Sequence, residues 1–180
     1  SAPLVVLHAS AMRTSLVTGA NRGIGLEYCR QLKARGDQVV AVCREPGPEL
    51  EALGARIEAG VELTDPDAVA ALMLRLKGVT LDLAILNAGV LQSMGLSDLD
   101  AEAIRLQFEV NALAPLQLSR ALMPLMPHGS KLILMTSRMG LIDDNSSGGS
   151  YGYRMSKVAL NMAGRSLAID LKPNGIAVAL

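Results

Sequence analysis

The sequence has 180 residues, of which 50% are hydrophobic and 19% are charged, a length and apolar fraction suited to one globular domain. Aromatic residues make up only 2%, and the 17 basic residues equal the 17 acidic ones, so nothing favours binding to nucleic acid or to an anionic membrane. No apolar run reaches the length of a membrane span, and the short apolar patch at residues 4–7 lacks the basic leader of a signal peptide. We therefore expect a cytoplasmic protein that acts on a small molecule.

The N-terminal residues and the cysteines carry no predicted function. Residues 1–11 precede Met12 and the first strand pattern, and could be an alternative start, a cloning remnant or a short extension. Cys29 and Cys43 have neither redox nor zinc spacing, and neither lies near a histidine in the sequence. We expect them to be small buried side chains, and we expect no metal site.

Short β-branched runs alternate with longer segments of helical spacing. The spacing predicts strands at residues 15–18, 38–43, 56–63, 81–86, 131–137 and 176–180. It predicts helices at residues 25–35, 66–76, 100–126 and 151–171, with a weaker one at 49–54. This alternation indicates a single α/β domain with a doubly wound parallel sheet. Its ligand crevice should lie at the carboxyl ends of the strands.

Two segments depart from simple patterns. Pro115 lies inside the long segment 100–126, and because proline lacks a backbone donor and clashes with the preceding turn, we expect a kink near Asn111. The segment 138–150 ends in Asn-Ser-Ser-Gly-Gly-Ser, a composition typical of a mobile loop.

A glycine-rich turn directly follows the first predicted strand. The run from Thr18 to Gly25 reads Thr-Gly-Ala-Asn-Arg-Gly-Ile-Gly and opens the first helix. Its glycines permit a tight turn and a close approach of the backbone to a pyrophosphate, and the helix N-terminus offers unpaired N–H groups. An ordinary turn is the alternative, but the strand-turn-helix context favours a dinucleotide site that includes Gly19, Asn21, Arg22, Gly23 and Ile24.

The end of the second strand favours NADP(H) over NAD(H). An acidic residue there would bind the adenosine ribose hydroxyls, but Cys43 and Arg44 occupy the position. Arg44 and Arg22 could together bind a 2′-phosphate, for which the forked guanidinium is well matched. Glu45 is the counterargument, because one residue of register would let it reach the ribose, so NAD(H) stays possible.

Tyr153 and Lys157 are four residues apart near the start of the last predicted helix. This spacing places the phenol and the ammonium on one helix face. A cation a few ångströms from a phenol favours the ionised phenolate, which is the form that accepts a proton. The pair is therefore a candidate for proton transfer, although such a pair can also arise by chance.

The ordered motifs resemble those of the short-chain dehydrogenase/reductase family. The glycine turn, Asn87-Ala88-Gly89 after the fourth strand, Asn111, Ser137 and Tyr153-x-x-x-Lys157 occur in the family's order. The resemblance covers residues 14–180, and the stretch Tyr-Gly-Tyr-Arg-Met-Ser-Lys is similar to the C-factor-like and carbonyl-reductase-like branch.

The resemblance implies a role for each matched residue. Ser137 would donate a hydrogen bond to the substrate carbonyl oxygen, and Tyr153 would deliver or remove its proton. Lys157 would bind the nicotinamide ribose and activate Tyr153, and Asn111 would hold a water that links Lys157 to solvent. Further cofactor contacts are implied along Asn87, Ala88 and Gly89, and at Glu62 and Leu63, where glutamate replaces the family's aspartate.

The resemblance also implies a Rossmann-type sheet in strand order 3-2-1-4-5-6, and features beyond this site. Family members continue from the sixth strand into a Pro-Gly turn, a substrate loop and a seventh strand, whereas this sequence ends at Leu180. We therefore expect the seventh strand to be missing and the NAD(P)-binding domain, residues 12–180, to be C-terminally incomplete. The resemblance implies a homodimer or homotetramer that forms through the long kinked helix and the helix that carries Tyr153. On the latter helix Ala159, Ala163 and Leu167 recur at helical spacing, but burial against the protein's own sheet explains this spacing equally well.

The sequence thus predicts an NAD(P)-dependent oxidoreductase that interconverts a small carbonyl compound and an alcohol. The first alternative is a cofactor-binding regulatory or signalling protein with little or no turnover, suggested by the C-factor-like resemblance. The second is a flavodoxin-like or other nucleotide-binding domain without hydride transfer.

Overall fold

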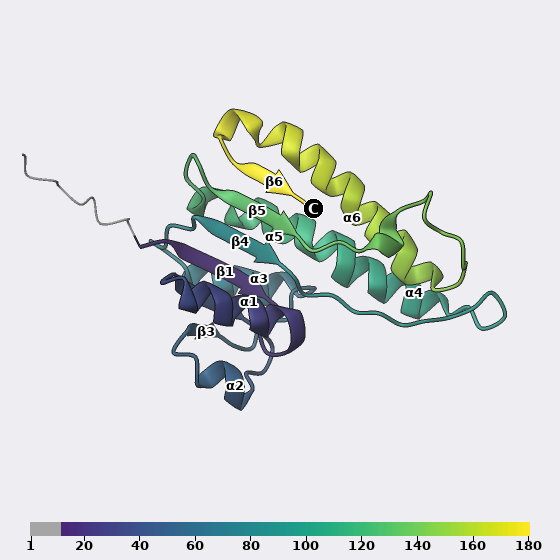
Figure 1. The fold of residues 1–180 in the computed structure, drawn as a ribbon, viewed down its shortest axis with the longest axis horizontal. Coiled ribbons are helices and arrows are strands. Elements are labelled where there is room, and N and C mark those ends of the chain that lie inside the picture. The colour runs from purple at the N-terminus through teal and green to yellow at the C-terminus, as the bar shows by residue number, and fades with distance from the viewer. Residues whose placement is uncertain (1–11) are drawn as a thin grey trace, which may run out of the picture.

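The computed structural model describes residues 12–180, which form a six-stranded parallel sheet with helices on both faces (Figure 1). The strand order is β3-β2-β1-β4-β5-β6, and every neighbouring pair is parallel. This confirms the predicted fold class and strand order. The residues before Met12 lie outside the described part of the chain.

The elements follow one another in the predicted alternation. The strands are β1 (Thr14–Thr18), β2 (Gln38–Val42), β3 (Arg56–Glu58), β4 (Leu83–Leu86), β5 (Lys131–Leu134) and β6 (Ala177–Ala179). The α-helices are α1 (Gly23–Ala34), α2 (Pro48–Glu51), α3 (Pro66–Arg75), α4 (Ala101–Phe108), α5 (Ala114–Leu122) and α6 (Tyr151–Asp170). Between them lie the π-helical turn η1 (Glu109–Leu113) and the 3₁₀ turns η2 (Met123–Leu125), η3 (Arg138–Gly140) and η4 (Lys172–Asn174).

The predicted long helix is interrupted where Pro115 requires it. It divides into α4, the π-helical turn η1 that contains Asn111, and α5, in which Pro115 stands in the first turn. Proline has no N–H to bond the carbonyl of Asn111 four residues earlier, and a wider turn accommodates that loss. The α-helix is therefore interrupted at Asn111, at the position where the kink was predicted.

Several strands are shorter than the sequence pattern suggested. The third strand was expected to reach residue 63, but β3 ends at Glu58 and Gly60 takes a positive φ of 71°. Beyond that turn the chain still lies beside β2, since Gly60 N donates to Arg44 O and Val61 N to Cys43 O. Val61 is buried there without belonging to the ladder, so the apolar run alone overestimated the strand.

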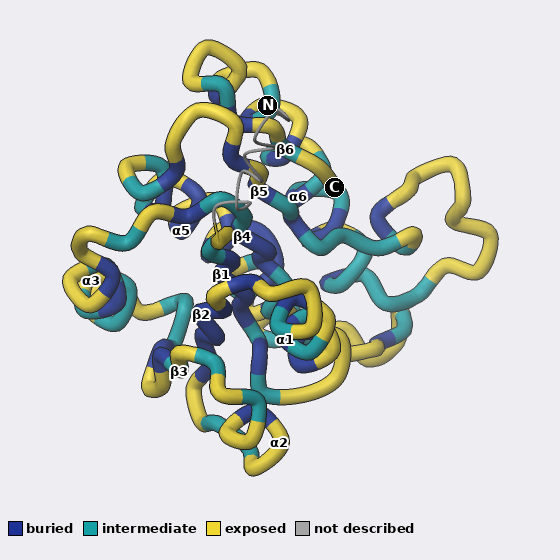
Figure 2. The backbone as a smooth tube through the Cα atoms, turned by 60° about the vertical axis from the view of Figure 1, so that its left-hand side comes forward, coloured by how far each residue is buried: buried dark blue, intermediate teal, exposed yellow. Residues whose placement is uncertain are grey.

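Two apolar layers cover the two faces of the sheet, and the strands between them are the most buried part of the backbone (Figure 2). One layer packs leucines of α3, α5 and α6 against the sheet, and the other packs α1 and α2. Leu167 lies in the first layer at 8% exposure, so its helical spacing reflects burial in its own core and not an exposed interface. Cys29 and Cys43 are buried free thiols, and burial raises the pKa of both, that of Cys29 to about 11.

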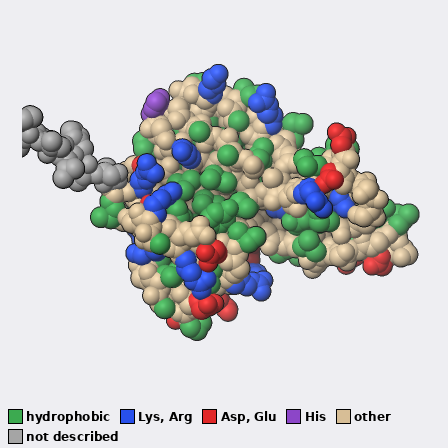
Figure 3. Space-filling view, viewed as in Figure 1, with side chains coloured by type: hydrophobic (Ala, Val, Ile, Leu, Met, Phe, Trp, Pro, Cys, Tyr) green, Lys and Arg blue, Asp and Glu red, His purple; other side chains and the backbone are tan. Residues whose placement is uncertain are grey.

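Hydrophobic side chains also reach the surface beside α1 (Figure 3). On this face, Leu83, Ile133 and Met135 of the central and outer strands are only partly buried. Within residues 12–180, no helix is long and apolar enough to cross a membrane.

Candidate active site

The glycine turn joins the end of β1 to the start of α1. Gly19 and Gly23 have positive φ values of 64° and 55°, which side chains disfavour. A Cβ on Gly25 would lie 2.1 Å from the carbonyl oxygen of Gly19, so only glycine lets α1 approach the turn this closely. Thr18 Oγ1 ties the turn to the end of β4 by accepting from the backbone N–H groups of Asn87 and Ala88 at 3.0 and 3.1 Å.

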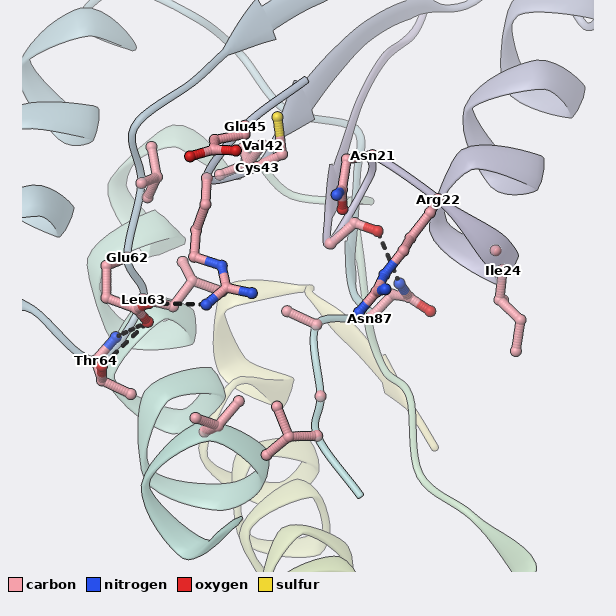
Figure 4. Close-up of a pocket in the computed structure, with 18 of the residues that line it drawn as sticks. Asn21, Arg22, Ile24, Val42, Cys43, Glu45, Glu62, Leu63, Thr64 and Asn87 are labelled. Carbon is pink, nitrogen blue, oxygen red and sulfur yellow. Dashed lines mark hydrogen bonds and ion pairs between the residues drawn. The ribbon is translucent and has the colours of Figure 1, made fainter. Parts of the chain in front are cut away.

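A cavity of about 830 Å³ opens above this turn, at the carboxyl ends of the strands. In Figure 4, Asn21, Arg22 and Asn87 lie on one side of it, and Glu62 and Leu63 lie on the opposite side. The predicted cofactor residues that line it are Gly19, Asn21, Arg22, Gly23, Ile24, Arg44, Glu62, Leu63, Asn87, Ala88 and Gly89. Two further predicted residues, Thr18 and Gly25, are buried beneath the turn.

The rim of the cavity carries charges of both signs. Arg44 forms an ion pair with Glu62 at 3.6 Å, and both side chains are exposed. The other carboxylate oxygen of Glu62 accepts from Thr64 N and Oγ1. Glu45, whose acidic side chain would favour NAD(H), also lines the cavity. The two arginines are thus both at the cavity, but Arg44 already has an acidic partner.

Lys157 and Tyr153 share one face of α6, as predicted. The Lys157 side chain is 4% exposed, and its Nζ lies 5.7 Å from the centroid of the Tyr153 ring. Nζ donates a hydrogen bond to the carbonyl oxygen of Met135 at 2.7 Å. Burial lowers the pKa of Lys157 to about 8, so the ammonium is retained at neutral pH and lost as the pH rises through about 8.

Asn111 lies in the π-helical turn, with its side chain held by protein groups. Its Oδ1 accepts from Val90 N at 2.8 Å, and its Nδ2 donates to Val90 O and Ser156 Oγ at 2.8 and 3.0 Å. A Cβ on Gly89 would lie 3.1 Å from Asn111 Oδ1 and 3.7 Å from Lys157 Nζ. The fold therefore brings Asn111 and Lys157 to the same glycine at the end of the cavity.

Ser137 follows β5 and caps the short turn η3. Its Oγ accepts from Met139 N at 3.2 Å, and its carbonyl oxygen accepts from Gly140 N at 2.8 Å. Gly140 packs against α6 so closely that a Cβ there would lie 3.0 Å from the backbone carbon of Lys157. The serine turn is therefore in direct contact with the helix that carries the tyrosine and the lysine.

Comparison with known proteins decides the family. The model of the short chain dehydrogenase family matches residues 13–180. The chain belongs to the short chain dehydrogenase family. The match covers nearly all of the described chain, as does the resemblance in the motifs.

Two curated relatives of this short chain dehydrogenase differ in their named roles. A 1-hydroxy-2-glutathionyl-2-methyl-3-butene dehydrogenase of Rhodococcus sp. (strain AD45) is 44% identical over 171 residues, which are 94% of this chain and 76% of that protein. The C-signal protein of Myxococcus xanthus is 43% identical over 102 residues, 55% of this chain and 61% of that protein. The chain therefore spans between 61% and 76% of the length of these two relatives.

Solved structures share the fold of this short chain dehydrogenase closely. A carbonyl reductase from Pseudomonas aeruginosa PAO1 in complex with NADP superposes with a TM-score of 0.84 at 33% identity. The match covers 93% of this chain and 80% of the reductase.

Sequence reasoning missed several residues of this dehydrogenase's site. Thr64, Leu106 and Val110 line the cavity, although no motif names them. Thr64 could have been found from its place after the third strand, at the edge where parallel strands meet a ligand.

Proposed function

We propose that this protein is an NAD(P)-dependent oxidoreductase that interconverts a carbonyl compound and an alcohol, with Tyr153 as general acid and base. The observation that carries the proposal is the buried Lys157 ammonium, 5.7 Å from the Tyr153 ring centroid and next to Gly89 at the end of the cavity. Burying a cation costs free energy because the charge loses its hydration. Beside a phenol this cation stabilises the phenolate, which is useful where a proton must leave and return to the phenol.

The cavity fits a dinucleotide. Its volume of about 830 Å³ lies over a glycine turn and the N-terminus of α1, which favour a pyrophosphate. Space is open at Gly23, where a Cβ would meet no atom within 4 Å. We propose NADP(H) as the preferred cofactor because Arg22 and Arg44 both line the cavity, and the similar carbonyl reductase from Pseudomonas aeruginosa binds NADP. The acidic neighbours Glu45 and Glu62 keep NAD(H) as the second choice.

Each of the four matched residues has one task in this proposal. A bound nicotinamide ring supplies or accepts the hydride. Ser137 donates a hydrogen bond to the carbonyl oxygen and keeps its proton, while its own oxygen accepts from Met139 N. Tyr153 gives its proton to that oxygen during reduction and takes it back during oxidation, and Lys157 stabilises the phenolate and binds the ribose. Asn111 would order a water beside Lys157.

Two names among the relatives suggest which substrates to try first. The Rhodococcus relative is named as a dehydrogenase of an alcohol that carries a glutathionyl group, and the Pseudomonas structure is a carbonyl reductase. We therefore propose small aldehydes, ketones and primary alcohols, including thioether-substituted ones, as the substrate class.

The test is turnover of this panel by the wild type and by Tyr153→Phe, followed through NADPH absorbance. Phenylalanine keeps the ring and removes the acid, so we expect kcat to fall by at least about 100-fold while NADPH binding is unchanged. Tyr151→Phe, two residues earlier on the same helix, is the matched control and should retain activity. Equal turnover by Tyr153→Phe and the wild type would refute the proposed acid.

A second candidate function is a cofactor-binding regulatory or signalling protein, favoured by the 43% identity to the C-signal protein. It would bind NADPH in the same cavity without oxidising it. Calorimetric binding of NADPH, together with no turnover of any carbonyl in the panel, would support this candidate over the enzyme.

We also propose that the protein forms a homodimer or homotetramer through α6 and the kinked helix. Met155, Met162 and Ile169 are spaced by seven residues on α6 and are 48%, 68% and 57% exposed. Residues seven apart lie on one helix face, so they form an apolar stripe that a second copy could cover. Met162→Glu should shift sedimentation toward the monomer, and an unchanged sedimentation coefficient would refute this interface.

A further inference from the structure

Asn161 joins the two ends of the turn that carries Ser137. It lies on α6 one helical turn beyond Lys157. Its Oδ1 accepts a hydrogen bond from Thr136 Oγ1, and its Nδ2 donates to the carbonyl oxygen of Gly140 at 3.0 Å. One carboxamide therefore spans the turn from the residue before Ser137 to the residue three after it.

The turn has little else to fix it against the helix. Within the turn, Gly140 N donates to Ser137 O and Met139 N donates to Ser137 Oγ. These two bonds shape the turn but do not tie it to α6. The segment that follows, residues 141–148, is exposed along its whole length. Besides the bond from Lys157 Nζ to Met135 O, two residues before Ser137, the side chain of Asn161 and the packing of Gly140 therefore hold the serine turn against α6.

We propose that Asn161 is a positioning residue that holds the Ser137 hydroxyl in register with the Tyr153 hydroxyl. The inference rests on the proposed function, in which both hydroxyls contact one carbonyl oxygen. Tyr153 and Asn161 are both part of α6, eight residues apart, so a bond from Asn161 to the serine turn fixes one hydroxyl relative to the other. A misplacement of about 1 Å in such a pair is enough to lower a rate about 100-fold.

The side-chain chemistry at this position is specific. Thr136 needs an acceptor and Gly140 needs a donor, and a carboxamide offers both at once. Aspartate would keep the acceptor but place a second oxygen against the Gly140 carbonyl. Alanine would offer neither group.

The kinetic test compares Asn161→Ala with the wild type in carbonyl reduction. We expect kcat to fall about tenfold, with the NADPH dissociation constant and the pH midpoint of the reaction unchanged, because Asn161 bonds neither a residue of the cavity nor Lys157 Nζ. In a Ser137→Ala background the same change should cost less than about twofold, since the serine that Asn161 positions is gone. A full tenfold loss in that background would overturn the proposal. Ser166→Ala, at an exposed position of α6, is the matched control.

A second measurement does not depend on turnover. Hydrogen exchange of the amides at residues 138–141 should accelerate about fivefold or more in Asn161→Ala, and not in Ser166→Ala. Unchanged exchange there would overturn the proposal even if activity fell. A wild type that reduces no carbonyl would contradict the proposed function alone, and the exchange rates would still decide whether Asn161 holds the turn.

Thr136→Val gives the same test without touching α6. Valine keeps the shape of threonine and removes the hydroxyl that Asn161 accepts from. We expect a smaller loss of kcat, about threefold, and faster exchange in the same amides. If Asn161→Ala does not fold, Thr136→Val decides, and wild-type kinetics and exchange in this variant would overturn the proposal.

Discussion

Replacing the buried Lys157 with methionine should make the protein's stability less dependent on alkaline pH. Burial lowers the lysine pKa from 10.5 to about 8. Each unit corresponds to about 1.4 kcal/mol between the protonation states, so the folded protein carries a cost of about 3 kcal/mol at neutral pH for its buried ammonium. Methionine fills a similar volume without a charge and removes that cost.

The substitution also removes a favourable contact. Lys157 Nζ donates to Met135 O at 2.7 Å, and leaving that carbonyl without a donor costs about 1–3 kcal/mol. At neutral pH, Lys157→Met should therefore be between equally stable and about 2 kcal/mol more stable than the wild type. Catalysis should be lost, because the cation beside Tyr153 is gone.

The sign of the pH dependence follows from the direction of the shift. Because the folded pKa of Lys157 lies below the unfolded one, the unfolded chain holds the extra proton between about pH 8 and pH 10.5. The contribution of Lys157 to the free energy of unfolding of the wild type therefore rises with pH through that window, whereas methionine does not titrate and makes no such contribution. Any advantage of the variant should shrink by about 3 kcal/mol by pH 10.5, which is about 6–12 °C in Tm for a chain of this size.

Thermal unfolding followed by circular dichroism at several values from about pH 7 to about pH 10.5 measures this directly. The quantity of interest is the difference in Tm between Lys157→Met and the wild type, because the titration of other residues then cancels. Lys77→Met, at an exposed lysine, is the control and should show a constant difference. Parallel curves for Lys157→Met and the wild type would refute the argument that burial makes this lysine costly.

Two further predictions concern the cofactor cavity. Gly25→Ala would place a Cβ 2.1 Å from the carbonyl oxygen of Gly19. We therefore expect Tm to fall by roughly 2–12 °C in calorimetry and NADPH binding to be lost. Gly47→Ala, whose Cβ would make only an ordinary 3.6 Å contact, is the control. Glu62→Gln removes the acidic partner of Arg44, 3.6 Å away, and should raise the preference for NADPH over NADH by about two- to fivefold; an unchanged ratio of dissociation constants would show that the pair has no part in cofactor choice.

The features that the sequence predicted well are local ones. The glycine turn follows a strand and opens a helix within eight residues, so its pattern is complete in one stretch of chain. The break at Asn111 follows from Pro115 four residues later, because a missing N–H has the same consequence in any helix. The parallel sheet followed from the alternation of strands and helices, and its strand order followed from the resemblance of the local motifs to the family.

The features that the sequence could not predict depend on contacts between distant segments. The ion pair of Arg44 with Glu62 joins residues after two neighbouring strands. It forms because the chain turns at Gly60 and runs back beside Cys43 and Arg44, the residues that follow β2. The bond from Asn161 to Gly140 spans 21 residues. Charge and position made Arg44 a candidate ligand of a 2′-phosphate, but only the folded chain shows that this arginine already has a partner in Glu62.

In the proposed mechanism two hydroxyls from different elements contact one substrate atom, and this gives a reason for the polar groups that are buried beside them. Tyr153 is carried by a helix and Ser137 by the turn after a strand, so their separation depends on how the helix packs on that turn. Apolar packing has no preferred direction at such a contact, whereas a hydrogen bond restricts both the distance and the orientation of its two groups. The Asn161 amide supplies that direction for the serine, and the bond from Lys157 to Met135 O supplies it for the lysine. Side chains from two successive turns of α6 therefore hold Met135 and Thr136, the two residues that precede Ser137. These bonds form without substrate, and this preorganised geometry offsets the free-energy cost of burying Lys157.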